Sequence, residues 1–163
     1  MGFVLMKEHR LDCATESLPL ALGILHTEWQ QKRRGRAMPP PSDIDPSELH
    51  YNLVGRVHLL EVEGPSRFRY RLYGRKMANP GASDMTGLTT LDYTDMVFGT
   101  LVTRHLSECV RGRSPICYEI RGVLDGEPYE YTRLALPLSS DGDRVDMILV
   151  ASMRGTVPEK AKR

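Results

Sequence analysis

The chain has 163 residues, and its 22 Lys and Arg residues against 21 Asp and Glu residues give a formal net charge of +1. This length predicts one domain, and the near-zero charge argues against a protein that neutralises many phosphates. With 40% hydrophobic and 26% charged residues, the composition excludes a disordered chain and a membrane protein.

The first 16 residues are interpreted as an N-terminal extension. Their apolar start, Gly2 to Met6, is too short for the core of a signal peptide, and no basic region precedes it. No later stretch approaches the ~20 apolar residues of a membrane span. Cys13, Cys109 and Cys117 match neither a zinc signature nor a Cys-x-x-Cys motif, which predicts reduced thiols and no metal site. We therefore expect a cytoplasmic protein with no membrane contact.

An amphipathic helix is predicted over residues 17–35. Its apolar positions recur at intervals of three and four residues from a possible cap at Ser17, as on one helical face: Leu18, Leu22, Leu25 and Trp29. The basic residues 32–36 lie where positive charge meets the negative end of the helix dipole, and Gly35 can end the helix. The Pro-rich segment 37–50 cannot continue a helix and is interpreted as a stiff connector.

Residues 57–73 alternate with period two around a Gly-Pro-Ser sequence, which predicts two strands and a tight loop. The register that pairs Glu63 with Arg67 sets three further pairs opposite one another: Glu61 and Arg69, Leu60 and Tyr70, and Val62 and Phe68. Carboxylates then face Arg67 and Arg69 across the hairpin. Arg71 has no acid opposite it in this register.

After the hairpin, Pro80, Gly81 and Gly87 allow only short helical turns. A longer helix begins at Asp92 and ends at Arg111-Gly112, with one apolar stripe formed by Phe98, Val102, Leu106 and Cys109. Two Asp-Gly hairpin signals then separate three strands, expected at residues 116–123, 128–138 and 144–153. The polar tail 154–163 is expected to be flexible.

Both faces of the last two strands are apolar. Registering them on the second Asp-Gly turn places Leu134, Leu136 and Leu138 beside Leu149, Met147 and Val145, with Ala135 beside Ile148 on the other face. A sheet with two apolar faces needs two covering layers. The central helices and the N-terminal helix can supply them, and an intermolecular surface can replace either.

This order of elements is similar to a PAS domain preceded by an N-terminal helix. Five motifs narrow the resemblance: Trp29 through Arg33-Arg34-Gly35-Arg36 and Pro39; Asp43-Ile44-Asp45-Pro46; Arg67-Phe68-Arg69-Tyr70-Arg71-Leu72-Tyr73-Gly74; Asp84-Met85-Thr86-Gly87; and Leu136-Pro137-Leu138-Ser139-Ser140-Asp141-Gly142. In this order they resemble a bacterial family of stand-alone PAS proteins, once catalogued only as a domain of unknown function.

The resemblance implies an α+β fold with a five-stranded antiparallel sheet. Short central helices and one longer helix would cover one face, and the N-terminal amphipathic helix would be added. The domain would span residues 17–153, between the extension 1–16 and the tail 154–163. The resemblance implies a sensory or protein-interaction module, with no agreed ligand and no catalytic residues.

The ~10 residues after Met153 are too few for an output domain, so we expect the module to act through a protein partner or a homodimer. The face formed by Leu18, Leu22, Leu25 and Trp29 is then either the dimer interface or a surface packed on its own sheet. Both interpretations stay open at this point.

A PAS pocket would lie between the sheet and the central helices, with these candidate residues: Tyr70, His105, Tyr118, Tyr131 and Arg133. The first Asp-Gly turn sets Tyr131 opposite Ile120 and Arg133 opposite Tyr118, on one face of the sheet. An arginine among aromatic rings can bind a carboxylate or phosphate by two hydrogen bonds. It can instead extend to the edge of the sheet or pair with an internal acid such as Asp84.

The cofactor stays unknown, and haem and flavin are not favoured. Haem-binding PAS sensors take a histidine from the helix that carries His105, but closer to the following strand. Photochemical flavin domains place their cysteine in a local motif that is absent around Cys109. The other histidines show no paired spacing typical of a metal site.

We expect a non-enzymatic sensory module that binds a small molecule, a protein partner or both. The sequence contains neither Gly-x-Ser-x-Gly nor Gly-x-Gly-x-x-Gly. One alternative is a small-molecule enzyme whose site is assembled from distant residues, which would need convergent buried ionisable groups. A second alternative is a nucleic-acid-binding regulator that uses the basic residues 32–36 and 111–113.

Overall fold

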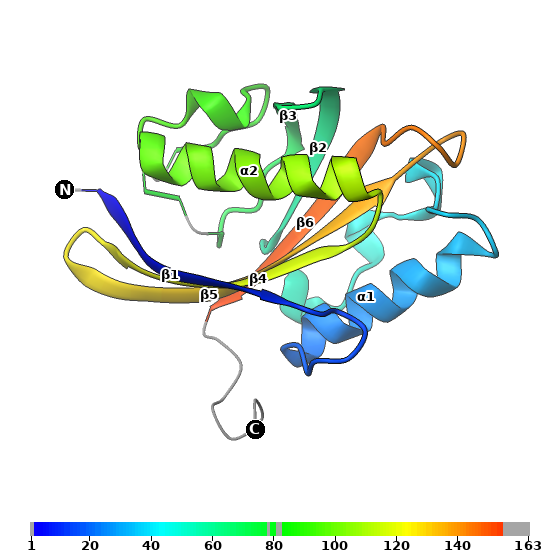
Figure 1. The fold of residues 1–163 in the computed structure, drawn as a ribbon, viewed down its shortest axis with the longest axis horizontal. Helices are drawn as coiled ribbons and strands as arrows, with labels where there is room; N and C mark the ends of the chain where they lie inside the picture. The colour runs from blue at the N-terminus through cyan, green and yellow to red at the C-terminus, as the bar shows by residue number, and fades with distance from the viewer. Residues whose placement is uncertain (1, 78, 81–82, 155–163) are drawn as a thin grey trace.

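A six-stranded antiparallel sheet forms the centre of the computed structural model, which describes residues 2–77, 79–80 and 83–154 (Figure 1). In chain order the strands are β1 (Phe3–Leu11), β2 (Val57–Gly64), β3 (Arg67–Leu72), β4 (Ile116–Leu124), β5 (Glu127–Leu138) and β6 (Met147–Arg154). Across the sheet the order is β1-β4-β5-β6-β2-β3. Helix α1 (Leu20–Arg33) lies on one face and helix α2 (Met96–Gly112) on the other. The α+β prediction with antiparallel strands is confirmed.

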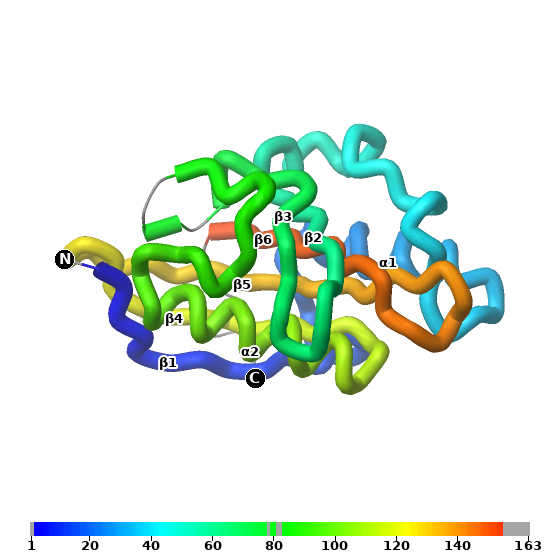
Figure 2. The backbone as a smooth tube through the Cα atoms, turned by 90° about the horizontal axis from the view of Figure 1, so that it is seen from above, coloured from blue at the N-terminus to red at the C-terminus, as the bar shows by residue number. Residues whose placement is uncertain are grey.

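The predicted count of five strands was wrong, because residues 3–11 form an additional edge strand. Strand β1 pairs antiparallel with β4, from Phe3 opposite Leu124 to Leu11 opposite Cys117 (Figure 2). Only its two end residues are buried, and Lys7 to Arg10 lie between them. A mostly polar edge strand carries little period-two signal, which is why this segment was interpreted as an extension.

Helix α1 covers one face of the sheet with the residues that its periodicity predicts. The helix begins at Leu20, with Pro19 in the capping position, so the predicted start at Ser17 was wrong. It ends at Arg33, and Arg34 and Gly35 then adopt positive φ angles. The Trp29 indole Nε1 donates a hydrogen bond to the Pro137 carbonyl oxygen on β5, at 2.8 Å.

This packing decides between the two interpretations of the helical face. Leu22, Leu25 and Trp29 are at most 2% exposed within a single chain, and Leu18 is partly buried against the same core. The chain's own sheet therefore covers the face on which we had placed a candidate dimer interface. The apolar surface is already removed from water, so it offers little to a second subunit.

Helix α2 covers the opposite face and begins four residues later than predicted. The Asp95 carboxylate accepts a hydrogen bond from the Phe98 N–H at 2.9 Å and caps the helix. Asp92 instead closes a capping box around the short turn Thr90–Asp92. The predicted stripe faces the sheet, and its four residues, Phe98, Val102, Leu106 and Cys109, are at most 4% exposed. Neither of the two described α-helices is long and apolar enough to cross a membrane.

The connector 37–50 packs against the rest of the domain. It contains the short 3-10 turns Pro41–Asp43 and Pro46–Glu48, and Met38 at its start is fully buried. In segment 77–91, where proline and glycine predicted only short helical turns, the described residues form turns. Thr89 of this segment forms an antiparallel β-bridge with Arg69 of β3. Of the predicted tail 154–163, all but Arg154 lies outside the described residues.

The predicted pairing of β5 with β6 was wrong by two residues. Leu136 pairs with Leu149 and Leu138 with Met147. Residues 139–146 form a wider loop, in which the Asp141 carboxylate accepts hydrogen bonds from the N–H groups of Asp143 and Arg144 at 2.8 Å. A shift of two residues keeps each side chain on its face, so the prediction of two apolar faces is confirmed.

Replacing Trp29 with alanine tests how α1 is held. We expect Trp29→Ala to lower the free energy of unfolding by about 3–5 kcal/mol, because it leaves a cavity and an unpaired carbonyl oxygen. Urea unfolding followed by circular dichroism measures the change. Leu20→Ala is the control: Leu20 lies on the same helix but is 72% exposed, and its cost should stay within about 0.5 kcal/mol. Equal costs for the two variants would contradict this packing.

Candidate ligand site

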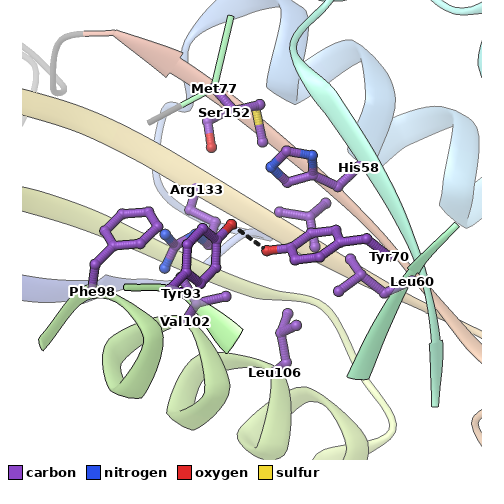
Figure 3. Close-up of a pocket in the computed structure, with 11 residues that line it drawn as sticks. His58, Leu60, Tyr70, Met77, Tyr93, Phe98, Val102, Leu106, Arg133 and Ser152 are labelled. Carbon is purple, nitrogen blue, oxygen red and sulfur yellow. Dashed lines mark hydrogen bonds between the residues drawn. The ribbon is translucent and has the colours of Figure 1, made fainter. Parts of the chain in front are cut away.

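A small cavity lies between the sheet and α2. Its walls come from four strands, α2 and two loop residues, with these side chains: His58, Leu60, Tyr70, Met77, Tyr93, Phe98, Val102, Leu106, Arg133, Val150 and Ser152 (Figure 3). The cavity volume is about 10 Å³, which is room for about one water molecule. The alternation of β2, β3, β5 and β6 places these side chains on the sheet face that α2 covers.

Arg133 is the one cationic side chain among the residues that line this cavity. It is 4% exposed, and its guanidinium donates to His105 Nδ1 at 2.8 Å and to the Tyr131 hydroxyl at 3.1 Å. The guanidinium carbon also lies 5.4 Å from the centre of the Tyr131 ring and 5.9 Å from that of Phe98. Within the described residues no carboxylate forms an ion pair with Arg133. The positive charge therefore has only neutral direct partners.

His105 connects Arg133 to a carboxylate on β1. Its Nε2 lies 2.7 Å from Glu8 Oε2, and Arg104 contacts the other oxygen of Glu8 at 2.5 Å. Because Arg133 can only donate, Nδ1 of His105 must accept, which places the ring proton on Nε2. Burial, followed by the positive charges of Arg133 and Arg104, lowers the pKa of His105 to about 2. A neutral imidazole thus joins the buried guanidinium to a distant counter-ion.

Hydroxyl groups and a second neutral histidine form another wall. The hydroxyl oxygen of Tyr93 lies 2.7 Å from that of Tyr70 and 3.2 Å from that of Tyr73. Burial raises the pKa of all three tyrosines, so they stay protonated. His58 stacks on Tyr73 and accepts the Gly74 N–H at its Nδ1, at 2.9 Å. Burial, with a smaller contribution from Arg133, lowers the pKa of His58 to about 3.

The predicted pocket residues divide into three groups. Tyr70 and Arg133 line the cavity, whereas His105 and Tyr131 contact Arg133 from behind it. Tyr118 lies outside: its ring stacks on His105, and its hydroxyl donates to Glu108 at 2.7 Å. The predicted pairings of Tyr131 with Ile120 and Arg133 with Tyr118 are confirmed.

Sequence reasoning missed four polar or flexible residues of the site: His58, Met77, Tyr93 and Ser152. A signal existed for His58, because period two places it on the face of Leu60, which was registered opposite Tyr70. Met77 and Tyr93 come from irregular segments, where no periodicity indicates a face. The suggested acid partner, Asp84, does not reach Arg133: it is exposed and accepts hydrogen bonds from Thr86.

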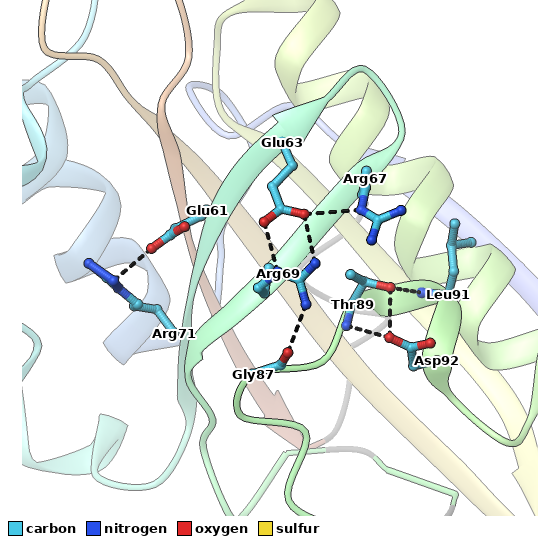
Figure 4. Close-up of polar contacts among 9 residues, drawn as sticks. All are labelled: Glu61, Glu63, Arg67, Arg69, Arg71, Gly87, Thr89, Leu91 and Asp92. Carbon is cyan, nitrogen blue, oxygen red and sulfur yellow. Dashed lines mark hydrogen bonds and ion pairs between the residues drawn. The ribbon is translucent and has the colours of Figure 1, made fainter.

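Surface carboxylates pair with the arginines of the β2–β3 hairpin (Figure 4). The predicted pairing of Glu61 with Arg69 across the strands is confirmed, as are the two apolar pairs. The side chains, however, bind diagonally: Arg69 contacts Glu63 at 2.7 Å and Arg71 contacts Glu61 at 2.7 Å. No acid lies directly opposite Arg71 in the register, as predicted, but its long side chain reaches the diagonal neighbour Glu61. The predicted backbone pairing of Glu63 with Arg67 was wrong, because a bulge places Gly64 opposite Arg67. The Glu63 carboxylate nevertheless forms an ion pair with Arg67.

The two basic runs proposed for nucleic acid are also engaged within the chain. Lys32 donates to the Asp43 carbonyl oxygen at 2.7 Å, and Arg36 pairs with the Asp43 carboxylate at 3.0 Å. Arg113 pairs with Asp143. These contacts give both runs a structural role.

The cluster around Arg133 also bears on the enzyme alternative, which needed convergent buried ionisable groups. Such a cluster exists, but the residues that line the cavity include neither a carboxylate nor a thiol. Both ring nitrogens of His105 are engaged in hydrogen bonds, so neither has a lone pair free for a haem iron. Neutral histidines, protonated tyrosines and one cation are suited to binding a polar group.

The comparisons with known proteins agree with this fold. A family model described as PAS domain matches residues 20–151. The chain belongs to the PAS domain family. No curated protein and no solved structure matches it. PAS domains are in general sensory and regulatory modules and not enzymes. The matched segment of this PAS domain contains Arg133 and every residue that lines the cavity except Ser152, which follows it directly, whereas β1, with Glu8, precedes it.

The neutral buried histidines predict how stability depends on pH. The unfolded chain protonates His58 below its ordinary pKa of 6.5, but the folded chain does so only near about 3. The contribution of neutral His58 to the free energy of unfolding is therefore complete above pH 6.5. It falls as the pH decreases, by about 1.4 kcal/mol per pH unit for each such histidine. We expect His58→Asn, which keeps an acceptor for Gly74, to reduce that slope by about this amount between roughly pH 4 and 6.

Urea unfolding at a series of pH values measures this slope. His9→Gln is the control, because His9 is exposed on β1 and its replacement should leave the slope as in the wild type. An unchanged slope in His58→Asn would contradict the buried neutral state of His58.

Proposed function

We propose that this PAS domain is a sensory module whose input is a small anionic ligand, bound at Arg133 between the sheet and α2. The observation that carries the proposal is a buried guanidinium whose direct partners are all neutral. Burial of a charge is costly unless an opposite charge compensates it. A carboxylate or phosphate group compensates that charge directly and accepts the N–H groups that His105 and Tyr131 leave free.

The entry route passes Met77. This side chain lines both the cavity and an open surface groove of about 400 Å³, together with Tyr73, Arg75 and Asp84, so it forms the wall between them. A ligand larger than water must displace this wall. Methionine has three rotatable bonds and adapts to different packing, so it is suited to moving aside.

The output of the sensor passes, in this proposal, through His105 to β1. An anion on Arg133 supplies a direct counter-charge to the guanidinium and thereby changes its contact with His105, which in turn holds Glu8. A change at the ligand site thereby alters how the edge strand is held. A protein partner or a second copy of the chain would read that change.

Thermal shift measurements with matched ligands test the input. We expect acetate and propionate to raise the Tm of Met77→Ala by several degrees at saturation, because a ligand that binds only the folded state stabilises it. The neutral amides, acetamide and propionamide, should give little shift at the same ionic strength. Arg133→Gln added to Met77→Ala should abolish the response to the acids.

Arg121→Gln in the same background is the matched control, since Arg121 lies on the neighbouring strand β4 but does not line the cavity. It should retain the response. Equal shifts with acids and amides would contradict an anion site, and this comparison needs no change at Arg133. Persistence of the acid response in a folded Arg133→Gln variant would also contradict it.

A further inference from the structure

A pair of cysteine thiols lies far from the ligand cavity, on the side of the sheet that α1 covers. Cys117 is on β4, opposite Leu11 of β1, and Cys13 follows in the turn that leads from β1 to α1. Both are reduced, and Cys13 lines a surface groove together with Pro115, which lies two residues before Cys117 in the chain. The pairing of β1 with β4 thus brings together two thiols that are 104 positions apart in the sequence.

The two thiols differ in access and in chemistry. Cys13 is half-buried and lines an open groove of about 570 Å³, together with Arg10, Asp12 and His26, whereas Cys117 is completely buried. The neighbouring Cys117 thiol lowers the pKa of Cys13, and the net shift is downward although burial and the Asp12 carboxylate oppose it. The interaction with Cys13, together with burial, raises the pKa of Cys117. A reagent in the groove therefore meets the thiol that ionises more readily.

The turn that carries Cys13 is fixed in place. The Asp12 carboxylate accepts the Ala14 N–H at 2.9 Å, and the Asp12 carbonyl oxygen accepts the Glu16 N–H at 2.9 Å. The Glu16 carboxylate accepts the Asp12 N–H at 3.0 Å. These bonds fix the turn that carries Cys13, two residues beyond Leu11, which lies opposite Cys117.

We propose that Cys13 and Cys117 are an oxidation site, at which a hydroperoxide converts the two thiols into a disulfide. The Cys13 thiolate attacks the terminal oxygen of the hydroperoxide, whose O–O bond breaks to give a sulfenic acid on Cys13 and an alkoxide, or hydroxide where the oxidant is hydrogen peroxide. The Cys117 sulfur then loses its proton and attacks the Cys13 sulfur, whose S–O bond breaks to release water. Two electrons pass from the thiols to the peroxide. The product ties the turn before α1 to β4.

Peptide mapping of the full chain tests the site. After limited hydrogen peroxide and alkylation under denaturing conditions, one thiol, Cys109, should remain free. Trypsin without reductant should release residues 11–32 joined to residues 114–121, with the loss of two hydrogen masses. Cys109 is the internal control: it is fully buried, and its Sγ lies 3.8 Å from the Ala135 carbonyl oxygen on β5. Cys109→Ser should therefore oxidise like the wild type.

Two variants separate the roles of the thiols. In Cys117→Ala, Cys13 should stop at the sulfenic acid, which dimedone traps, and the pH midpoint of its alkylation should shift upward because the neighbouring thiol that lowers its pKa is lost. In Cys13→Ser, Cys117 should stay reduced. Free Cys13 and Cys117 in oxidised wild type, or a disulfide that joins either of them to Cys109 or to a second chain, would overturn the proposal. The wild-type map decides the question even where a variant does not fold.

Discussion

The positive charge of Arg133 is buried between the sheet and α2, and compensating it requires contacts from α2, β5 and β1. Arg133 extends from β5 into a region where water cannot solvate it, and an uncompensated charge there costs several kcal/mol. Its direct partners are an imidazole from α2 and a hydroxyl from its own strand. The nearest carboxylate in this chain of contacts, Glu8, belongs to β1 and acts through His105. One side chain thus connects the edge strand, the central sheet and the covering helix.

The sheet is apolar on both faces, and the two helices remove both faces from water. α2 covers the face that carries the cavity, and α1 covers the other through Trp29 and the leucines beside it. The apolar face of the amphipathic helix is thus buried against the chain's own sheet. The groove at Cys13 and the groove beside Met77 lie on the surface of the molecule.

The two proposals assign different chemistry to the two faces. On the α2 face, neutral histidines and protonated tyrosines surround a cation, which favours an anionic ligand over proton transfer. On the α1 face, Cys13 lines an open groove, and Cys117 lies on the neighbouring strand β4. Strand β1 takes part in both, because it supplies Glu8 to the first and positions the turn of Cys13 for the second. Strand β1 precedes the segment that matches the PAS family. The contact of Glu8 with His105 and the turn that carries Cys13 therefore come from outside that segment.

The sequence by itself determined the local elements and which face each residue occupies. Period-two alternation and the Asp-Gly turns predicted five strands, and with them the pairs formed by Arg133 with Tyr118 and by Leu60 with Tyr70, because registers near a tight turn are fixed by the turn. Intervals of three and four residues predicted the buried faces of both helices. Only the tertiary structure decided that β1 is a strand, that Arg71 reaches an acid, and that Met77 and Tyr93 line the cavity with Arg133. These depend on contacts between segments far apart in the chain, and such contacts follow from packing and twist that no local pattern encodes.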